Sequence, residues 1–403
     1  MSEISERAKS AKDKPAPLGP DVELSGYTLE APEYGERELS EIDVVDPNRL
    51  LNAGVDVSGR ERSGSFIQVD RSVLHAAPTQ EGVEVMSVRD ALEAYPWVKD
   101  YMWKLVPVDQ DKYTARAMLE LHGGYFVRAL PGAKTFFPVQ ACLYLKADNI
   151  NQNVHNIVIA EEGSELHIIT GCATDSPELR GLHIGVSEFY VKRNAKITFS
   201  MIHNWAERVA VRPRSAIRID EGGLFLNNYV SLHPVESLQL FPSAYLVGKG
   251  ATARFNSILL APEGTFMDVG SRAYLQAPDT RCEMIARALT TGGEIINRGL
   301  LVGEIPGVRA HLECRGLILK KKGRIYAIPE LDGRVEGVDM SHEAAVGRIA
   351  REEVEYLMAR GLSEDEAVAT IVRGFLNVDI EGLPPILKEQ IDSAIEISEQ
   401  SLL

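Results

Sequence analysis

Cysteine is scarce in this chain of 403 residues, and no two cysteines lie close together in the sequence. The four are Cys142, Cys172, Cys282 and Cys314, and no CxxC motif occurs. This spacing excludes a disulfide scaffold, and it excludes a zinc or four-thiolate site built within one short segment. Any metal site must therefore be assembled in three dimensions, perhaps between chains.

Long apolar runs are also missing. No stretch approaches the roughly eighteen apolar residues that a membrane-spanning helix needs, so we expect no membrane partner. The first residues, MSEISERAKSAKDKPAPLGPD, are polar and lack the apolar core of a secretory signal. We therefore expect residues 1–25 to be a disordered lead-in and the protein to be cytoplasmic.

Basic residues are outnumbered, with 43 Lys and Arg against 58 Asp and Glu, a net charge of -15. This balance disfavours binding to phosphate backbones, so nucleic acid is not an expected partner. No Walker A glycine-lysine sequence occurs, so the chain is not expected to hydrolyse ATP or to be an enzyme.

The N-terminal part of the chain shows a helical pattern. Between Val85 and Val106, the apolar residues Trp97, Tyr101 and Leu105 recur every four residues. We predict that residues 26–120 form a mixed, largely helical module.

Residues 121–338 read as a succession of short alternating segments such as YFVRAL and ACLYLKA, each ended by a glycine or asparagine turn, which predicts β-strands. The turns recur at 31, 28 and 28 residues in a first series, and at 28 and 31 in a second series offset by 14; the turn residues are Gly163, Asn194, Gly222 and Gly250, then Gly264, Gly292 and Gly323. A repeat of about 30 residues without helices is typical of a β-helix. A β-sandwich is the alternative, since it also has many short strands.

Helical patterns return in residues 339–403. Ser363 and Glu366 form an S-x-x-E capping box after Gly361, and Pro384 with Pro385 precedes a last amphipathic segment. We predict a C-terminal helical module that covers the open edge of the β stack and presents a face to a partner.

The first group of residues that could carry chemistry is His311, Glu313 and Cys314, followed by His342 and Glu343. Thiolate, imidazole and carboxylate groups hold iron and iron-sulfur clusters. On a strand, Cys314 points away from His311 and Glu313, so the three cannot bind one metal without a bulge. One turn of the stack brings His342 and Glu343 alongside, which favours Cys314 with either of them. Alternatively, Cys314 is a buried small hydrophobe, His311 is a surface residue, and the His342-Glu343 pair only starts a helix.

The second group is Cys172, in the segment ITGCATD, followed by the segment IHNW at residues 202–205. A cysteine in a glycine-flanked bend is accessible enough to accept sulfur, and the alternative is a plain turn cysteine. Cys142 and Cys282 lie in alternating segments and are predicted to be core residues.

Residues 341–375, SHEAAVGRIAREEVEYLMARGLSEDEAVATIVRGF, closely resemble the C-terminal signature of the SufB/SufD family, the scaffold proteins of SUF iron-sulfur cluster assembly. The resemblance extends over YPWVKDYMWKLVPVDQDKY, LHIGVSEFYVKRNAKITFSMIHNW and the Cys314 segment, and is greatest to archaeal SufB-like members. It implies a right-handed parallel β-helix flanked by helical modules. Two departures are His203, where many bacterial members have glutamine, and Arg212 with Arg214 where a lysine is expected.

The same resemblance implies roles for the site residues. Cys314, His342 and Glu343 match the positions that help to form a nascent cluster, and Cys172 matches a cysteine that receives sulfur from a donor protein. A separate SufC ATPase is expected to dock on the C-terminal helices, for which Arg360 and Phe375 are the candidate contacts. The expected partner is a second copy or a paralogue, and the iron-sulfur cluster is transient.

We therefore expect a scaffold for iron-sulfur cluster assembly that is able to act as a homodimer. One alternative is a SufD-like subunit that supports assembly without holding a cluster. Another is a β-helix that binds a polysaccharide, which would need ladders of exposed aromatics or clustered carboxylates that the strands do not show.

Overall fold

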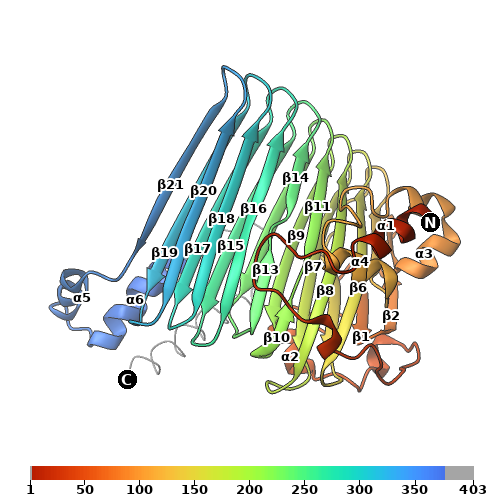
Figure 1. The fold of residues 1–403 in the computed structure, drawn as a ribbon, viewed down its shortest axis with the longest axis horizontal. Helices are drawn as coiled ribbons and strands as arrows, with labels where there is room; N and C mark the ends of the chain where they lie inside the picture. The colour runs from red at the N-terminus through yellow and green to blue at the C-terminus, as the bar shows by residue number, and fades with distance from the viewer. Residues whose placement is uncertain (1, 377–403) are drawn as a thin grey trace.

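The computed structural model describes residues 2–376, and most of them form a parallel β-helix with helices at both ends of the stack (Figure 1). The predicted β-helix is confirmed, and the β-sandwich alternative is wrong, because successive coils pair in parallel rather than as antiparallel hairpins. Among residues 2–376, no helix is long and apolar enough to cross a membrane.

Two sheets form the walls of the stack. Sheet I contains, in spatial order, β2 (Ser72–Pro78), β1 (Gly64–Val69), β5 (Val139–Leu145), β7 (Glu165–Thr174), β9 (Lys196–Asn204), β12 (Leu224–Ser231), β15 (Thr252–Ala261), β17 (Arg281–Thr290), β19 (Arg309–Ile318) and β21 (Asp339–Gly347). Sheet II is built from β3 (Val83–Ser87), β4 (Tyr125–Ala129), β6 (Ile150–Ala160), β8 (Arg180–Val191), β11 (Arg214–Ile219), β14 (Ser243–Leu246), β16 (Phe266–Leu275), β18 (Glu294–Gly303) and β20 (Arg324–Gly333), with the short β10 (Arg208–Val211) and β13 (Ser237–Leu240) alongside.

The strand register explains the two turn series. Arg281 pairs with Arg309, and Arg309 pairs with Asp339, so one coil takes 28 and then 30 residues. Gly163 and Asn194 lie in turns that lead from sheet II to sheet I, whereas Gly264 lies in a turn that leads from sheet I to sheet II. The offset of 14 residues is therefore half a coil, and the two series mark the two long edges of one β-helix. Gly163 and Asn194 have φ values of 71° and 55°, the left-handed conformation that glycine and asparagine adopt most readily.

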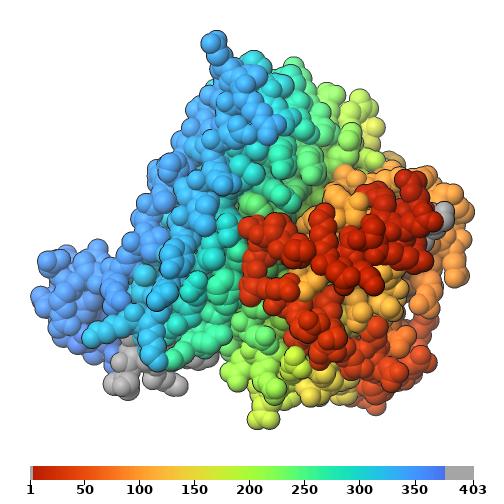
Figure 2. All heavy atoms as spheres, in the orientation of Figure 1, coloured from red at the N-terminus to blue at the C-terminus, as the bar shows by residue number. Residues whose placement is uncertain are grey.

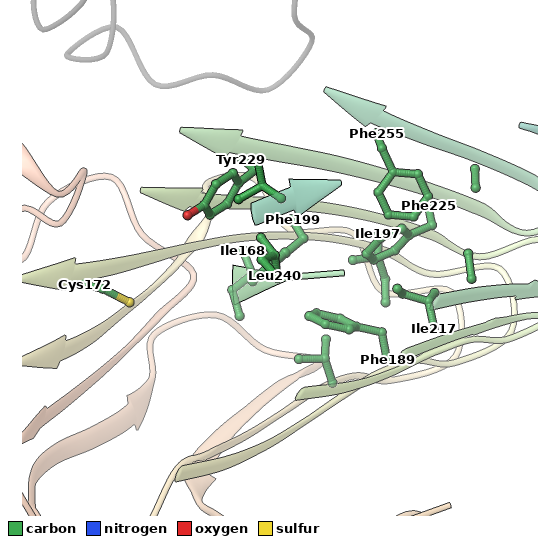
Figure 3. Close-up of a cluster of buried hydrophobic side chains, with 14 of the residues drawn as sticks. Ile168, Cys172, Phe189, Ile197, Phe199, Ile217, Phe225, Tyr229, Leu240 and Phe255 are labelled. Atoms are coloured by element: carbon green, nitrogen blue, oxygen red, sulfur yellow. The ribbon is translucent and has the colours of Figure 1, made fainter. Parts of the chain in front are cut away.

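The core lies between the two sheets. Inward-facing rings stack along it, with centroids of Phe189 and Phe199 4.7 Å apart, Phe189 and Phe225 5.3 Å apart, and Phe225 and Phe255 6.0 Å apart (Figure 3). Each ring comes from a different strand, so each coil buries its apolar face mainly against its two neighbours.

The N-terminal module packs on the outer face of sheet II. Its helices are α1 (Ser2–Ser10), α2 (Pro47–Asn52), α3 (Val88–Ala94) and α4 (Lys112–Leu119), with 3-10 turns at Leu24–Gly26, Leu39–Glu41 and Pro96–Asp100. The buried Glu188 carboxylate on β8 anchors this module, because it accepts hydrogen bonds from the backbone N–H groups of Trp103, Leu105 and Val106. Its contact with His155 Nε2, at 2.8 Å, ties the same carboxylate to β6.

Two predictions for this region need correction. The predicted disordered lead-in over residues 1–25 is wrong for residues 2–25, which include α1 with a fully buried Ala8 and an Arg7–Asp109 ion pair of 2.7 Å. In Figure 2 this segment lies across one side of the molecule. The module over residues 26–120 is mixed, as predicted, but it supplies β1, β2 and β3 to the sheets and is not largely helical.

The C-terminal boundary also differs from the prediction. Residues 339–347 form β21, the last strand of sheet I, and the helices are α5 (Arg351–Met358) and α6 (Glu364–Leu376). The predicted capping box is confirmed, since Glu366 Oε2 accepts from Ser363 N at 2.7 Å and Ser363 Oγ accepts from Glu366 N at 3.3 Å. The predicted helix after Pro384 and Pro385 lies outside the described residues.

Candidate functional site

Cys314 lies on β19, one coil below the end of the stack. Its side chain faces the interior with Leu312, and the residue is 1% exposed. In sheet I it pairs with Ala286 on one side and Ala344 of β21 on the other. Among the described strands of sheet I, only β21 lies beyond it.

His342 and Glu343 lie on β21, and the expectation that they start a helix is wrong. His342 pairs with Leu312, so it shares the inward face with Cys314. Glu343 pairs with Glu313 and faces outward. Both residues are exposed, because they lie on the last coil. The structure thus brings Cys314 and His342 together on one face and places Glu343 on the other.

His311 and Glu313 face outward, as the predicted alternation requires. His311 Nδ1 lies 2.9 Å from Ser341 Oγ. Glu313 Oε1 lies 2.8 Å from Arg287 Nη2 and 2.6 Å from Arg315 Nε. Because two guanidinium groups already engage this carboxylate on the outer face, neither His311 nor Glu313 joins Cys314 in one site.

Electrostatics keep the Cys314 thiol neutral in this conformation. Burial, with a smaller contribution from the neighbouring Glu313 carboxylate, raises the pKa of Cys314 to about 11. A metal-binding cysteine must be a thiolate. Within residues 2–376, no group of three His, Cys, Asp or Glu side chains is arranged to hold a metal ion. The single chain therefore presents at most a partial ligand set.

The last coil forms an open end of the stack (Figure 1). In the described part of the chain, β20 pairs only with β18, and β21 pairs only with β19, so each keeps one edge without a partner strand. Apolar side chains are exposed on this coil, namely Tyr326, Leu331 and Val346. Unpaired edges with apolar side chains are features of a surface that pairs with another chain.

Cys172 lies within β7, not in an accessible bend, and it is fully buried with its side chain facing the interior (Figure 3). The neighbouring Gly171 faces outward, where an added Cβ would lie 2.4 Å from the carbonyl oxygen of Ala53. This glycine therefore allows close packing of the segment after α2 rather than a bend. Burial raises the pKa of the Cys172 thiol well above its usual value.

A polar pair that the sequence did not single out lies beside Cys172. His203 pairs with Cys172 in adjacent strands, and its Nδ1 lies 2.8 Å from the hydroxyl of Tyr229. Burial lowers the pKa of His203 to about 3, so its imidazole is neutral. The 26-residue spacing between His203 and Tyr229 is close to one coil, which is the signal that could have paired them.

The two inward-facing thiols lie five strands apart in sheet I, on β7 and β19, or about 24 Å at the usual strand spacing. Between them, Met201, Asn227 and Ser257 also face inward, yet each is only half-buried. The interior between Cys172 and Cys314 is therefore incompletely filled.

The other two cysteines are buried, as predicted. Cys282 faces the main core, whereas Cys142 faces outward and is covered by the N-terminal segment around Leu50 and Val55. All four cysteines are free thiols.

The two candidate partner contacts differ in their surroundings. The Arg360 guanidinium, just beyond α5, lies 4.7 Å from the ring of Tyr356, and both side chains are exposed. Phe375 on α6 is partly buried against an apolar cluster on the outer face of sheet I that includes Leu289 and Leu317. Phe375 therefore helps to hold α6 on the stack, and Tyr356 is an exposed aromatic that the sequence analysis did not select.

Comparison with known proteins gives a consistent result. Residues 143–375 match the family model described as "SUF system FeS cluster assembly, SufBD core domain". A protein of Archaeoglobus fulgidus named "Iron-sulfur cluster assembly SufBD family protein" is 52% identical over 371 residues, covering 92% of this chain and 98% of that protein. A similarly named protein of Methanothermobacter thermautotrophicus is 47% identical over 401 residues, covering 97% of each chain. A relative from Pyrococcus horikoshii is 30% identical over 349 residues, covering 85% of this chain and 78% of the relative.

Proposed function

The chain belongs to the SufBD family of SUF-system iron-sulfur cluster assembly proteins, and from this membership we propose that it is a scaffold subunit on which a nascent cluster is built. The cluster is cargo that is assembled and passed on. The observation that carries this proposal is the placement of Cys314 and His342 on one face of the last two strands of sheet I. Thiolate and imidazole are suitable ligands for such a cluster.

A second chain completes the site. The partial ligand set of one chain and the unpaired edges of β20 and β21 both support pairing through the open end of the stack. In a two-fold symmetric pair, each copy brings Cys314 and His342 to the dyad. A paralogue with the same end coil would serve equally well.

Cluster assembly requires the last coil to move. The Cys314 thiol is covered and neutral, and it becomes a ligand only when its proton leaves and the covering coil opens. Residues 348–350 alone separate β21 from α5. We place the SufC-type ATPase on the exposed side of α5 around Tyr356 and Arg360, where its closure would pull β21 away from Cys314.

Cys172 is the proposed sulfur acceptor. Its thiolate attacks the outer sulfur of a persulfide carried by a donor protein, a new S–S bond forms at Cys172, and the donor leaves as a thiolate. The incompletely filled interior supports a role for the space between the two thiols, while the full burial of Cys172 means that β7 must open locally for a donor to reach it. We place this chemistry in the cytoplasm, where free thiols stay reduced.

Anaerobic reconstitution with iron and sulfide, followed by visible absorption, tests the proposal. Wild type and Cys282→Ala, a matched variant of another buried, inward-facing cysteine, should both develop a cluster band. Cys314→Ala should lose it. A band that survives in Cys314→Ala contradicts the ligand assignment.

The second candidate function is that of a SufD-like subunit that supports assembly without holding a cluster. The burial and raised pKa of Cys314 favour it over the scaffold role. A wild-type protein that pairs normally but never develops a band would establish this alternative.

A further inference from the structure

A polar cavity of about 320 Å³ lies at the N-terminal end of the stack, far from β21. Residues 33–36 form one wall and lie against β2, where Tyr34 N donates to Ser72 Oγ at 3.1 Å and Arg37 N donates to Leu74 O at 2.8 Å. The beginning of α3 and residues 121–123 form the other walls. No proposed step of cluster assembly uses this cavity.

His122 lies in this cavity wall as a fixed hydrogen-bond donor. The residue is 8% exposed, its backbone N–H donates to Asn153 O at 2.9 Å, and its Nδ1 accepts from Asn153 N at 3.3 Å. The ring proton must therefore be on Nε2, which has no hydrogen-bond partner among residues 2–376. Burial, followed by the charges of Arg71 and Arg116, lowers the pKa of His122 to about 4, so the imidazole is neutral at physiological pH.

Gly124 fixes the position of this histidine. A Cβ at Gly124 would lie 2.2 Å from the carbonyl oxygen of His155 on β6, so the chain just after His122 is pressed directly against the sheet. The Gly124 N–H donates to Gln68 Oε1 at 2.9 Å, which secures the same segment from the other sheet. The His122 ring is thus held by backbone that has little freedom to move.

Charge divides the cavity into two parts. The groups that act electrostatically on His122 are both cations, Arg71 and Arg116. Acidic groups enter from the opposite wall, where Glu33 and Glu36 form no ion pair with any described residue. A purely anionic ligand would be repelled by these glutamates, and a purely cationic ligand would be repelled by the arginines.

We propose that this cavity binds a small zwitterion of the amino-acid class. Its carboxylate accepts hydrogen bonds from Arg71 and from His122 Nε2, and its ammonium group lies toward Glu33 and Glu36. Leu121 and Val73 provide apolar wall for a side chain. The cavity volume leaves room for a molecule of this size.

Isothermal titration calorimetry on the full chain tests this site, with L-leucine as the probe. Two analogues separate the charges: 4-methylpentanoate lacks the ammonium group, and 3-methylbutylamine lacks the carboxylate. We expect saturable binding of leucine and at least about tenfold weaker binding of each analogue. Equal binding of 4-methylpentanoate and leucine overturns the zwitterion, and the absence of saturable leucine binding overturns the site.

Two variants locate the binding within the cavity. Arg71→Met should weaken leucine binding by about tenfold or more, whereas Arg60→Met, at an exposed arginine outside the cavity, should not change it. Glu36→Gln, at an exposed position, provides a second variant if Arg71→Met lowers the melting temperature. Unchanged leucine affinity in both cavity variants contradicts the proposal. Cluster reconstitution should be unaffected by either one, so this test is independent of the scaffold function.

Discussion

Cys314 and His342 lie on the same inward face of adjacent parallel strands, displaced by two residues along the register, because His342 pairs with Leu312. Glu343, the next residue, pairs with Glu313 and faces the opposite side. This relationship separates two residues that are neighbours in the sequence, and it gives them different expected roles.

The first prediction compares these two neighbours. His342→Ala should lower the yield of reconstituted cluster several-fold, because it removes a ligand that shares a face with Cys314. Glu343→Gln should leave the yield within about twofold of wild type, because its carboxylate faces outward. Both residues are exposed, so neither variant should alter the melting temperature much. A larger loss in Glu343→Gln than in His342→Ala would contradict the facing.

The second prediction concerns alkaline pH. The Cys314 pKa is about 11 in the folded chain against 9.0 without burial, so unfolding releases its proton between these values. The stability that comes from keeping this thiol neutral is complete below pH 9 and is lost as pH rises toward 11, up to about 2 to 3 kcal/mol. Urea unfolding of wild type and Cys314→Ala from pH 7 to 10.5 should show a difference in unfolding free energy that shrinks above pH 9. A constant difference would contradict the shift.

The third prediction tests the close packing at β7. Gly171→Ala should lower the free energy of unfolding by about 1 to 3 kcal/mol, because its Cβ would strike the backbone of Ala53. Gly347→Ala is the matched control, since Gly347 also lies in a strand of sheet I and has nothing within 4 Å of an added Cβ. Chemical denaturation measures both, and equal effects would mean that the segment after α2 can yield.

The fourth prediction concerns pairing through the last coil. Leu331→Lys should convert a dimer to a monomer in light scattering, because it places a charge on an exposed apolar position of the unpaired β20 edge. Phe136→Lys changes an exposed apolar residue between β4 and β5, away from this edge, and should leave the assembly intact. Dissociation by Phe136→Lys alone would move the interface to the other end of the stack.

The fifth prediction separates ATPase docking from folding. Tyr356→Ala and Arg360→Ala should weaken capture of a SufC-type ATPase without changing the melting temperature, since both side chains are exposed. Phe375→Ala should lower both, because Phe375 also packs α6 against sheet I. Capture that is unchanged in Tyr356→Ala and Arg360→Ala would exclude this side of α5 as the docking surface.

The sequence predicted the β-helix because the turn residues, such as Gly163 and Gly264, recur at a coil length and at half a coil. It also predicted that Cys314 faces away from His311 and Glu313, since strand alternation is a local property. It could not predict that residues 339–347 add another strand, because the exposed face of a last coil has no apolar alternation to reveal it. The burial of Cys172 was missed for a related reason, as Gly171 is a glycine for the sake of a distant contact with Ala53.

The half-coil spacing of the turns has a consequence for how such a chain can change in length. Inserting or deleting part of a coil would exchange the inward and outward faces or move a turn into a strand, and only whole coils preserve the register. The separation of Cys172 and Cys314 therefore changes only in discrete increments of about 4.8 Å, one strand spacing at a time. The reach between the two thiols is a count of coils rather than a continuous distance.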